Sequence, residues 1–172
     1  LFDYQNSIAQ LMGFKDCEYC LAVEKLIKLY YRTVLIARNI SDILLQVSEQ
    51  KIAETTEQKQ VIKIDDYFQI IKHRIDAIDP NCFIKNPSLL LQVFCLVAQD
   101  NSIIGISAKT LRAIRAARYK IDHSFRNRKE NQTLFISFWH ILHTSSKAMF
   151  LMKRSGILAD YLVSFQKITG QM

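Results

Sequence analysis

The sequence predicts an all-α fold, a helical bundle with one long central helix. Apolar residues recur every three to four positions along most of the 172 residues, which is the spacing of one helix face. Only four glycines and two prolines interrupt the chain, and folds rich in strands need more turns than that. A single domain of this length buries about two-thirds of the surface that its unfolded chain exposes, so it needs no disulfides.

The N-terminal part predicts a short helix over residues 5–12 and a long helix over residues 17–50. Asp16 can cap the long helix, whose apolar residues form two adjacent stripes. Because two stripes make a wide apolar face, we expect this helix to lie inside the bundle, with Ile27 and Val34 buried.

The segment 49–60 is polar and predicts a fraying helix end and a linker. We expect one helical domain over residues 1–172, with a division into 1–55 and 65–172 as an alternative. Phe68 and Ile70 alternate with polar residues, which is typical of a strand. One small β-hairpin near 66–78 is therefore an alternative to a short helix there.

Four further helices are expected, at residues 86–99, 107–121, 127–142 and about 145–156. Asn86-Pro87 is a cap followed by proline, and Ser107 is a good cap for the next helix. Gly156 ends the last of the four helices, because glycine readily adopts the left-handed conformation that follows a helix. Two short turns follow it.

Positive charge is concentrated in one segment of the chain. The net charge is +7, and residues 107–130 carry eight bases against two acids. We expect Lys109, Arg112 and Arg115 to form part of an interdomain surface, although a solvated helix face is the simpler interpretation. Arg118 follows Leu111 by seven residues and so lies on the apolar face, where we expect it to be partly buried and paired with a carboxylate.

Other candidate sites have weak support. Cys17 and Cys20 have metal-ligand spacing, but a zinc site needs four ligands and the other cysteines are isolated. His140 and His143 are one helical turn apart, without acids nearby, and the pair Asp65-Asp66 is typical of a turn cap. We therefore expect no catalytic, cofactor-binding or metal-binding residue in this segment.

Several blocks of the chain, in a shared order, carry a family resemblance. They are Leu1-Phe2-Asp3, Gln5, Ala9-Gln10-Leu11, Gly105-Ile106, Thr110-Leu111-Arg112, Phe135, Ile141-Leu142 and, most specifically, Met152, Arg154, Gly156, Leu158, Tyr161-Leu162, Phe165, Ile168 and Gly170-Gln171-Met172. They resemble the central helical region of the bacterial protein-PII uridylyltransferase family, whose members transfer and remove uridylyl groups.

The resemblance implies that this segment lies between a nucleotidyltransferase core, upstream of Leu1, and a histidine–aspartate (HD) hydrolase domain, downstream of Met172. It implies Mg²⁺ and UTP for the parent enzyme, and the PII signalling protein of nitrogen regulation as its partner. We expect a fragment of a multidomain enzyme that is not catalytic alone and that positions the two domains. The alternatives are the helical part of another protein nucleotidyltransferase, such as a glutamine synthetase adenylyltransferase, and a stand-alone helical interaction module.

Composition also bears on location and partners. The sequence has no apolar run long enough to cross a membrane and no signal-peptide pattern, which predicts a cytoplasmic protein with reduced thiols. No aromatic platform accompanies the basic residues, so nucleic-acid binding is disfavoured.

Overall fold

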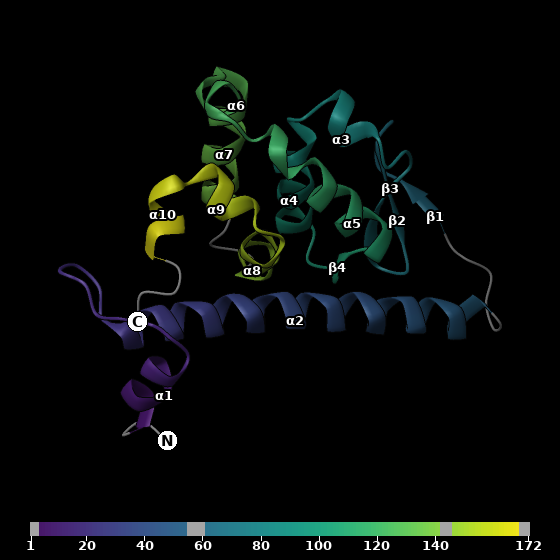
Figure 1. Cartoon of the computed structure of the whole chain (residues 1–172). Coiled ribbons are helices and arrows are strands. Elements are labelled where there is room, and N and C mark those ends of the chain that lie inside the picture. The colour runs from purple at the N-terminus through teal and green to yellow at the C-terminus, as the bar shows by residue number, and fades with distance from the viewer. Residues whose placement is uncertain (1–3, 55–60, 142–145, 169–172) are drawn as a thin grey trace.

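The computed structural model of the chain describes residues 4–54, 61–141 and 146–168 (Figure 1). These residues are mostly helical, as expected. They also form a four-stranded sheet, so the all-α prediction was incomplete.

Two helices form the N-terminal part. Helix α1 (Gln5–Leu11) ends just before Gly13, which has a left-handed φ of 85°. Helix α2 (Ala22–Glu54) begins five residues later than expected, because Cys17 and Cys20 first close a tight turn with two backbone hydrogen bonds. Asp16 still caps it, since its carboxylate accepts a hydrogen bond from the amide of Ala22 at 2.7 Å.

Helix α2 is long, as predicted, but it is not the centre of a bundle. It runs along one side of the molecule, beneath the sheet and the helices that follow it in the chain, with α1 below its N-terminal end in Figure 1. Val34 is 40% exposed and Ile27 is only half-buried. The prediction of a buried central helix is wrong for the described residues, because periodicity identifies an apolar face but not what covers it.

The end of helix α2 differs from the fraying expected there. Helix α2 continues to Glu54 instead of fraying from Glu49, and residues 55–60 lie outside the described residues. The sheet follows.

The predicted hairpin is present and forms the middle of the sheet. Strand β2 (Phe68–Ile71) pairs antiparallel with β3 (Arg74–Ala77), with Ile70 opposite Ile75. Lys72 and His73 join them with φ of 51° and 58°, the left-handed conformation that a two-residue hairpin loop requires.

Two strands that the sequence did not indicate flank this hairpin. Strand β1 (Val61–Lys63) adds antiparallel to β2, and the two-residue β4 (Gly105–Ile106) adds parallel to β3.

The remaining helices follow the predicted pattern with shorter pieces between them. Helix α4 (Leu89–Gln99), α5 (Ala108–Ala117), α7 (Lys129–Ile141) and α8 (Ser146–Ser155) correspond to the four expected helices. The expected cap of the first is wrong, because α4 begins at Leu89 with Ser88 at its N-cap position in place of Asn86. The short helices are α3 (Cys82–Lys85), the 3₁₀ turn η2 (Arg118–Lys120), α6 (His123–Asn127), α9 (Ile157–Tyr161) and α10 (Val163–Ile168).

Helix α4, not α2, forms the centre of the core. Leu89, Leu90, Leu91, Val93 and Phe94 are at most 1% exposed. This helix packs against both α7 and α8, so it is covered on several sides. A helix that is apolar all round must be buried in this way.

Because α4 is buried and α2 is largely exposed, shortening a side chain to alanine should destabilise the protein more in α4 than in α2. Leu90→Ala should lower the free energy of unfolding by about 2–5 kcal/mol, because it leaves a cavity in the core. Val34→Ala should change it by about 0.5 kcal/mol or less, since an exposed side chain loses little contact. Urea unfolding of the two variants measures both values, and similar losses at the two positions would contradict this location of the core.

Candidate interdomain surface

The basic helix α5 is held in place by a buried carboxylate on strand β3. Asp76 is 7% exposed, and its Oδ1 accepts a hydrogen bond from Ser107 Oγ at 2.5 Å. Ser107 also caps α5, as predicted, by accepting a hydrogen bond from the Thr110 amide. Thr110 Oγ1 in turn accepts a hydrogen bond from the Ala77 amide at 2.7 Å. These bonds fix the start of α5 against the sheet.

Lys109 belongs to this network more than to an open surface. Its Nζ lies 3.6 Å from Asp76 Oδ2 and donates to the carbonyl of Ala77 at 3.0 Å. Its charge is therefore used within the chain to offset the buried carboxylate.

Arg112 and Arg115 are different, because no ion pair of the described residues involves either one. Arg112 is exposed and Arg115 is half-buried. Burial, and then the neighbouring charge of Arg118, lower the pKa of Arg115. Arg115 thus carries a charge that the described residues leave uncompensated.

Arg118 lies where the sequence analysis expected it, partly buried beside a carboxylate. Its Nε and Nη2 donate to the two oxygens of Asp160 at 2.6 and 2.8 Å, which is a bidentate pair. This hydrogen bonding raises the pKa of Arg118. Asp160 belongs to α9, so the pair joins the end of α5 to the C-terminal helices.

Gly156 makes room for that pair. It has a φ of 86°, and a Cβ added there would lie 2.3 Å from Cζ of Arg118. The position therefore requires glycine twice, once for its backbone conformation and once for the guanidinium that covers it.

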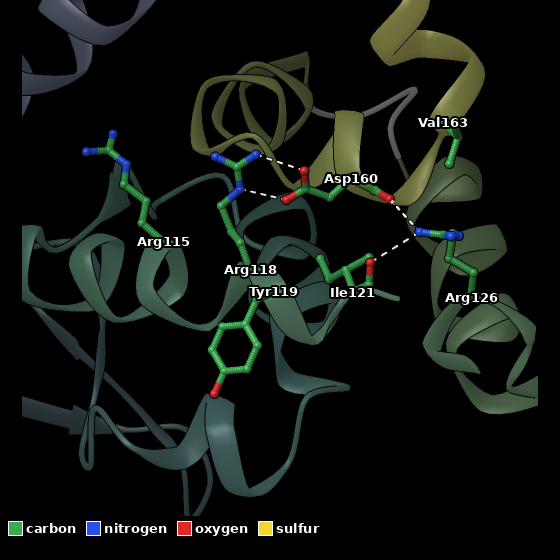
Figure 2. Close-up of a pocket in the computed structure, with 7 residues that line it drawn as sticks. All are labelled: Arg115, Arg118, Tyr119, Ile121, Arg126, Asp160 and Val163. Carbon is green, nitrogen blue, oxygen red and sulfur yellow. Dashed lines mark hydrogen bonds and ion pairs between the residues drawn. The ribbon is translucent and has the colours of Figure 1, made fainter. Parts of the chain in front are cut away.

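A shallow depression of about 510 Å³ surrounds the pair (Figure 2). Arg126 lines its other side and donates to the carbonyls of Ile121 and Asp160 at 3.2 and 3.1 Å. Figure 2 shows the Arg118 guanidinium facing Asp160, whereas the Arg115 side chain extends away from them. The depression is rich in arginine and contains one acid, which favours a negatively charged partner.

Arg115 also lines a second depression, of about 250 Å³, where α2 meets the body of the molecule. Asn39 and Asp42 of α2 form one wall. Arg154 of α8 reaches across and forms an ion pair with Asp42. Burial, and then the charge of Arg38, lower the pKa of Arg154. The contact between α2 and α8 therefore contains a charged pair, beside Leu45 of α2 and Leu151 of α8.

Sequence reasoning did not single out Asp42, Asp160 or Arg126 as functional residues. The sequence does set Asp42 apart, because it is the only acid among residues 25–48 and lies in a stretch with four bases. Nothing in the sequence indicates the pairing of Asp160, since its partner Arg118 is 42 residues away.

The cysteines divide into two kinds. Burial raises the pKa of Cys82 and of Cys95 to about 11, so both remain neutral thiols at physiological pH. Cys17 is exposed, and hydrogen bonds from the Tyr19 amide and from Lys25 lower its pKa. Within the described ranges, no three His, Cys, Asp or Glu residues are grouped so that they could hold a metal ion.

The remaining candidates have structural roles or lie outside the described part. Asp65 caps a turn, as predicted, by accepting hydrogen bonds from the amides of Tyr67 and Phe68. His140 is exposed on α7, and His143 falls among residues that the structure does not describe. No described helix is long and apolar enough to cross a membrane.

Comparisons with known proteins identify relatives of the chain. A family model described as the uridylyltransferase GlnD third domain matches residues 68–161. The chain is 37% identical over 172 residues to a bifunctional uridylyltransferase/uridylyl-removing enzyme of Pseudomonas aeruginosa. It is 37% identical to the enzyme of that name from Nitrosococcus oceani and 34% identical to the one from Stutzerimonas stutzeri. Each match covers 100% of this chain but 19% of the relative's length. No solved structure matches the chain.

Among the described residues, Gly13 and Gly156 have left-handed φ, and they provide a matched test of the Arg118 contact. Gly13→Ala should cost roughly 1–2 kcal/mol for the backbone conformation alone, since nothing lies within 4 Å of its added Cβ. Gly156→Ala should cost clearly more, because the added Cβ also collides with Arg118.

Two further variants, Arg118→Ala and Arg118→Ala/Gly156→Ala, isolate the collision. Measured relative to Arg118→Ala, the further change Gly156→Ala should cost no more than Gly13→Ala does. Chemical denaturation of all four variants gives these values. Equal costs for Gly13→Ala and Gly156→Ala in the native background would disprove the contact.

Proposed function

Because this chain belongs to the uridylyltransferase GlnD third-domain family, we propose that it is the non-catalytic connecting segment of a bifunctional uridylyltransferase/uridylyl-removing enzyme. It positions the transferase and hydrolase domains of the parent protein relative to each other. The chain spans about one-fifth of the length of its curated relatives, which leaves ample length for both activities elsewhere. Family membership favours this function over an adenylyltransferase or a stand-alone module.

The observation that carries the proposal is the polar contact between α2 and α8. Helix α2 has 33 residues and is therefore roughly 50 Å long. It meets α8 through the ion pair of Asp42 and Arg154, beside Asn39 and Arg115. Interfaces between domains are more polar than cores, and charged contacts fix an orientation more than they add stability. A long helix held in this way suits a joint between domains.

The parent enzyme would use UTP and Mg²⁺, and would modify a PII-type signalling protein in the cytoplasm. The relatives' names state both directions of uridylyl chemistry. This segment would hold neither UTP nor Mg²⁺.

The basic residues of α5 form the second part of the proposal. Arg112 and Arg115 face a neighbouring domain of the same chain, whereas Lys109 is engaged with Asp76. Acidic metal-binding surfaces of the catalytic domains would complement these two arginines.

A charge swap tests the joint between α2 and α8. In the full-length protein, Asp42→Arg and Arg154→Asp should each change the ratio of uridylyl transfer to uridylyl removal by about fivefold or more, because each disrupts the orientation of α2. The double variant should restore most of the native ratio, since it re-forms the pair in reverse. Lys153→Asp, at an exposed neighbouring position, is the control. Native ratios in all variants would refute the positioning function.

Charge reversal of Arg112 and Arg115 tests the basic surface. The double variant Arg112→Glu/Arg115→Glu should leave residues 1–172 folded, because these arginines form no ion pair within the described ranges. In the full-length protein it should change activity, and the effect should shrink as salt rises. Circular dichroism and activity assays at two ionic strengths measure this, and unchanged activity at both would favour a solvated helix face.

A further inference from the structure

One apolar side of α2 faces away from α8. Asp42 points to α8, as its pairing with Arg154 requires. At 100° per residue, the helix places another set of residues 120–180° away from Asp42. We define the members of this set between Leu29 and Leu44 as the outer face, and all of them are exposed: Leu29, Tyr30, Thr33, Ile36, Ala37, Ile40 and Leu44.

The outer face is large and strongly apolar. Ile36 is 60% exposed, Ile40 is 53% exposed and Leu44 is 61% exposed. From Leu29 to Leu44 the face extends roughly 22 Å along the helix. Soluble proteins rarely leave such a continuous apolar stripe open to water, and stripes of this kind mark interaction surfaces.

The position of α2 in the sequence indicates what covers the face. The third-domain family match begins at residue 68, after α2 has ended. A third domain has domains before it, and the relatives are about five times as long as this chain. Helix α1 packs on α2 and extends the apolar surface with Ile8 and Leu11, which are 40% and 88% exposed.

Charge argues against a second copy of α2 as the occupant. Residues 25–44 contain the bases Lys25, Lys28, Arg32 and Arg38 and one acid, Asp42, which is already paired. Of these bases, Lys25 and Arg32 lie about 100° and 80° from Asp42 and so border the outer face. Two such helices packed through this face would bring these bases near each other without acids to neutralise them. An occupant with apolar side chains and acidic flanks fits better.

We propose that the outer face of α2 is the docking surface for the domain that precedes this segment in the full-length protein. Helix α2 then has two different interfaces, an apolar one with the preceding domain and a polar one with α8. This inference rests on the proposed connecting function and names the surface through which one of the two domains is held.

Photocrosslinking in the full-length protein tests the occupant. A p-benzoylphenylalanine at Ile40 reports on the outer face. The same residue at Tyr31 is the control, because Tyr31 is exposed but lies only about 20° from the direction of Asp42. The experiment uses a mixture of isotopically light and heavy protein, together with the protein substrate and anionic lipid vesicles.

The expected result is a crosslink from position 40 to the polypeptide that precedes Leu1 in the same molecule, so that both crosslinked peptides carry the same isotope. Position 31 should give little or no crosslink to that polypeptide. Light–heavy crosslinks would assign the face to a second copy and overturn the proposal. Crosslinks to the substrate protein, vesicle binding through this face, or no crosslink from Ile40 would also overturn it.

A paired substitution gives an independent measurement. Ile36→Glu/Ile40→Glu should leave the secondary structure of residues 1–172 unchanged, because both side chains are already exposed there. In the full-length protein it should release the preceding domain and speed proteolysis before α2, whereas native proteolysis would contradict the docking surface. If the Asp42–Arg154 charge swap changes and then restores the activity ratio as expected, but Ile36→Glu/Ile40→Glu leaves proteolysis unchanged, the docking surface is rejected and the connecting function is not.

Discussion

The buried carboxylate of Asp76 is the interaction on which the arginine-rich side of the molecule depends. It accepts a hydrogen bond from Ser107 and lies near Lys109, so the first turn of α5 can bind the sheet in only one rotation. That rotation decides which way the later residues of the helix point, including Arg115 and Arg118. An uncompensated acid in this position would be costly, and the residues around it use most of its hydrogen-bonding capacity. The orientation of these arginines is therefore set by a polar contact inside the protein.

The charges around α5 and α8 are incompletely balanced within the described residues. Arg118 has Asp160 and Arg154 has Asp42, but a second arginine lies near each pair, since the charge of Arg118 lowers the pKa of Arg115 and the charge of Arg38 lowers the pKa of Arg154. Such like-charge neighbours are tolerated when a binding partner supplies the missing acid. The connecting function proposed above would place such a partner near the second depression, where α2 and α5 approach one another. Charge there can couple the orientation of α2 to whatever meets Arg115.

Local signals in the sequence predicted local structure well. The Ser107 cap, the glycine at the end of α8 and the need of Arg118 for a carboxylate all follow from the chemistry of one or two residues. Three features failed because they depend on distant segments. Strand β4 pairs with β3 across 31 residues, the identity of Asp160 as partner requires the folded chain, and the apolar stripes of α2 carry no information about what covers them. Asp76 could have been noticed as a lone acid between Ile75 and Ala77, both of which are fully buried.

The close approach of Arg118 to Gly156 also has an evolutionary consequence. The two positions are 38 residues apart in sequence, yet the Arg118 side chain leaves no room for a Cβ at position 156. A lineage that acquires a side chain at 156 must first lose the arginine, and then Asp160 loses its partner as well. Substitutions at these three positions should therefore occur together along the branches of the family. Such covariation would link the end of α5 to α9 in sequences alone, without reference to any structure.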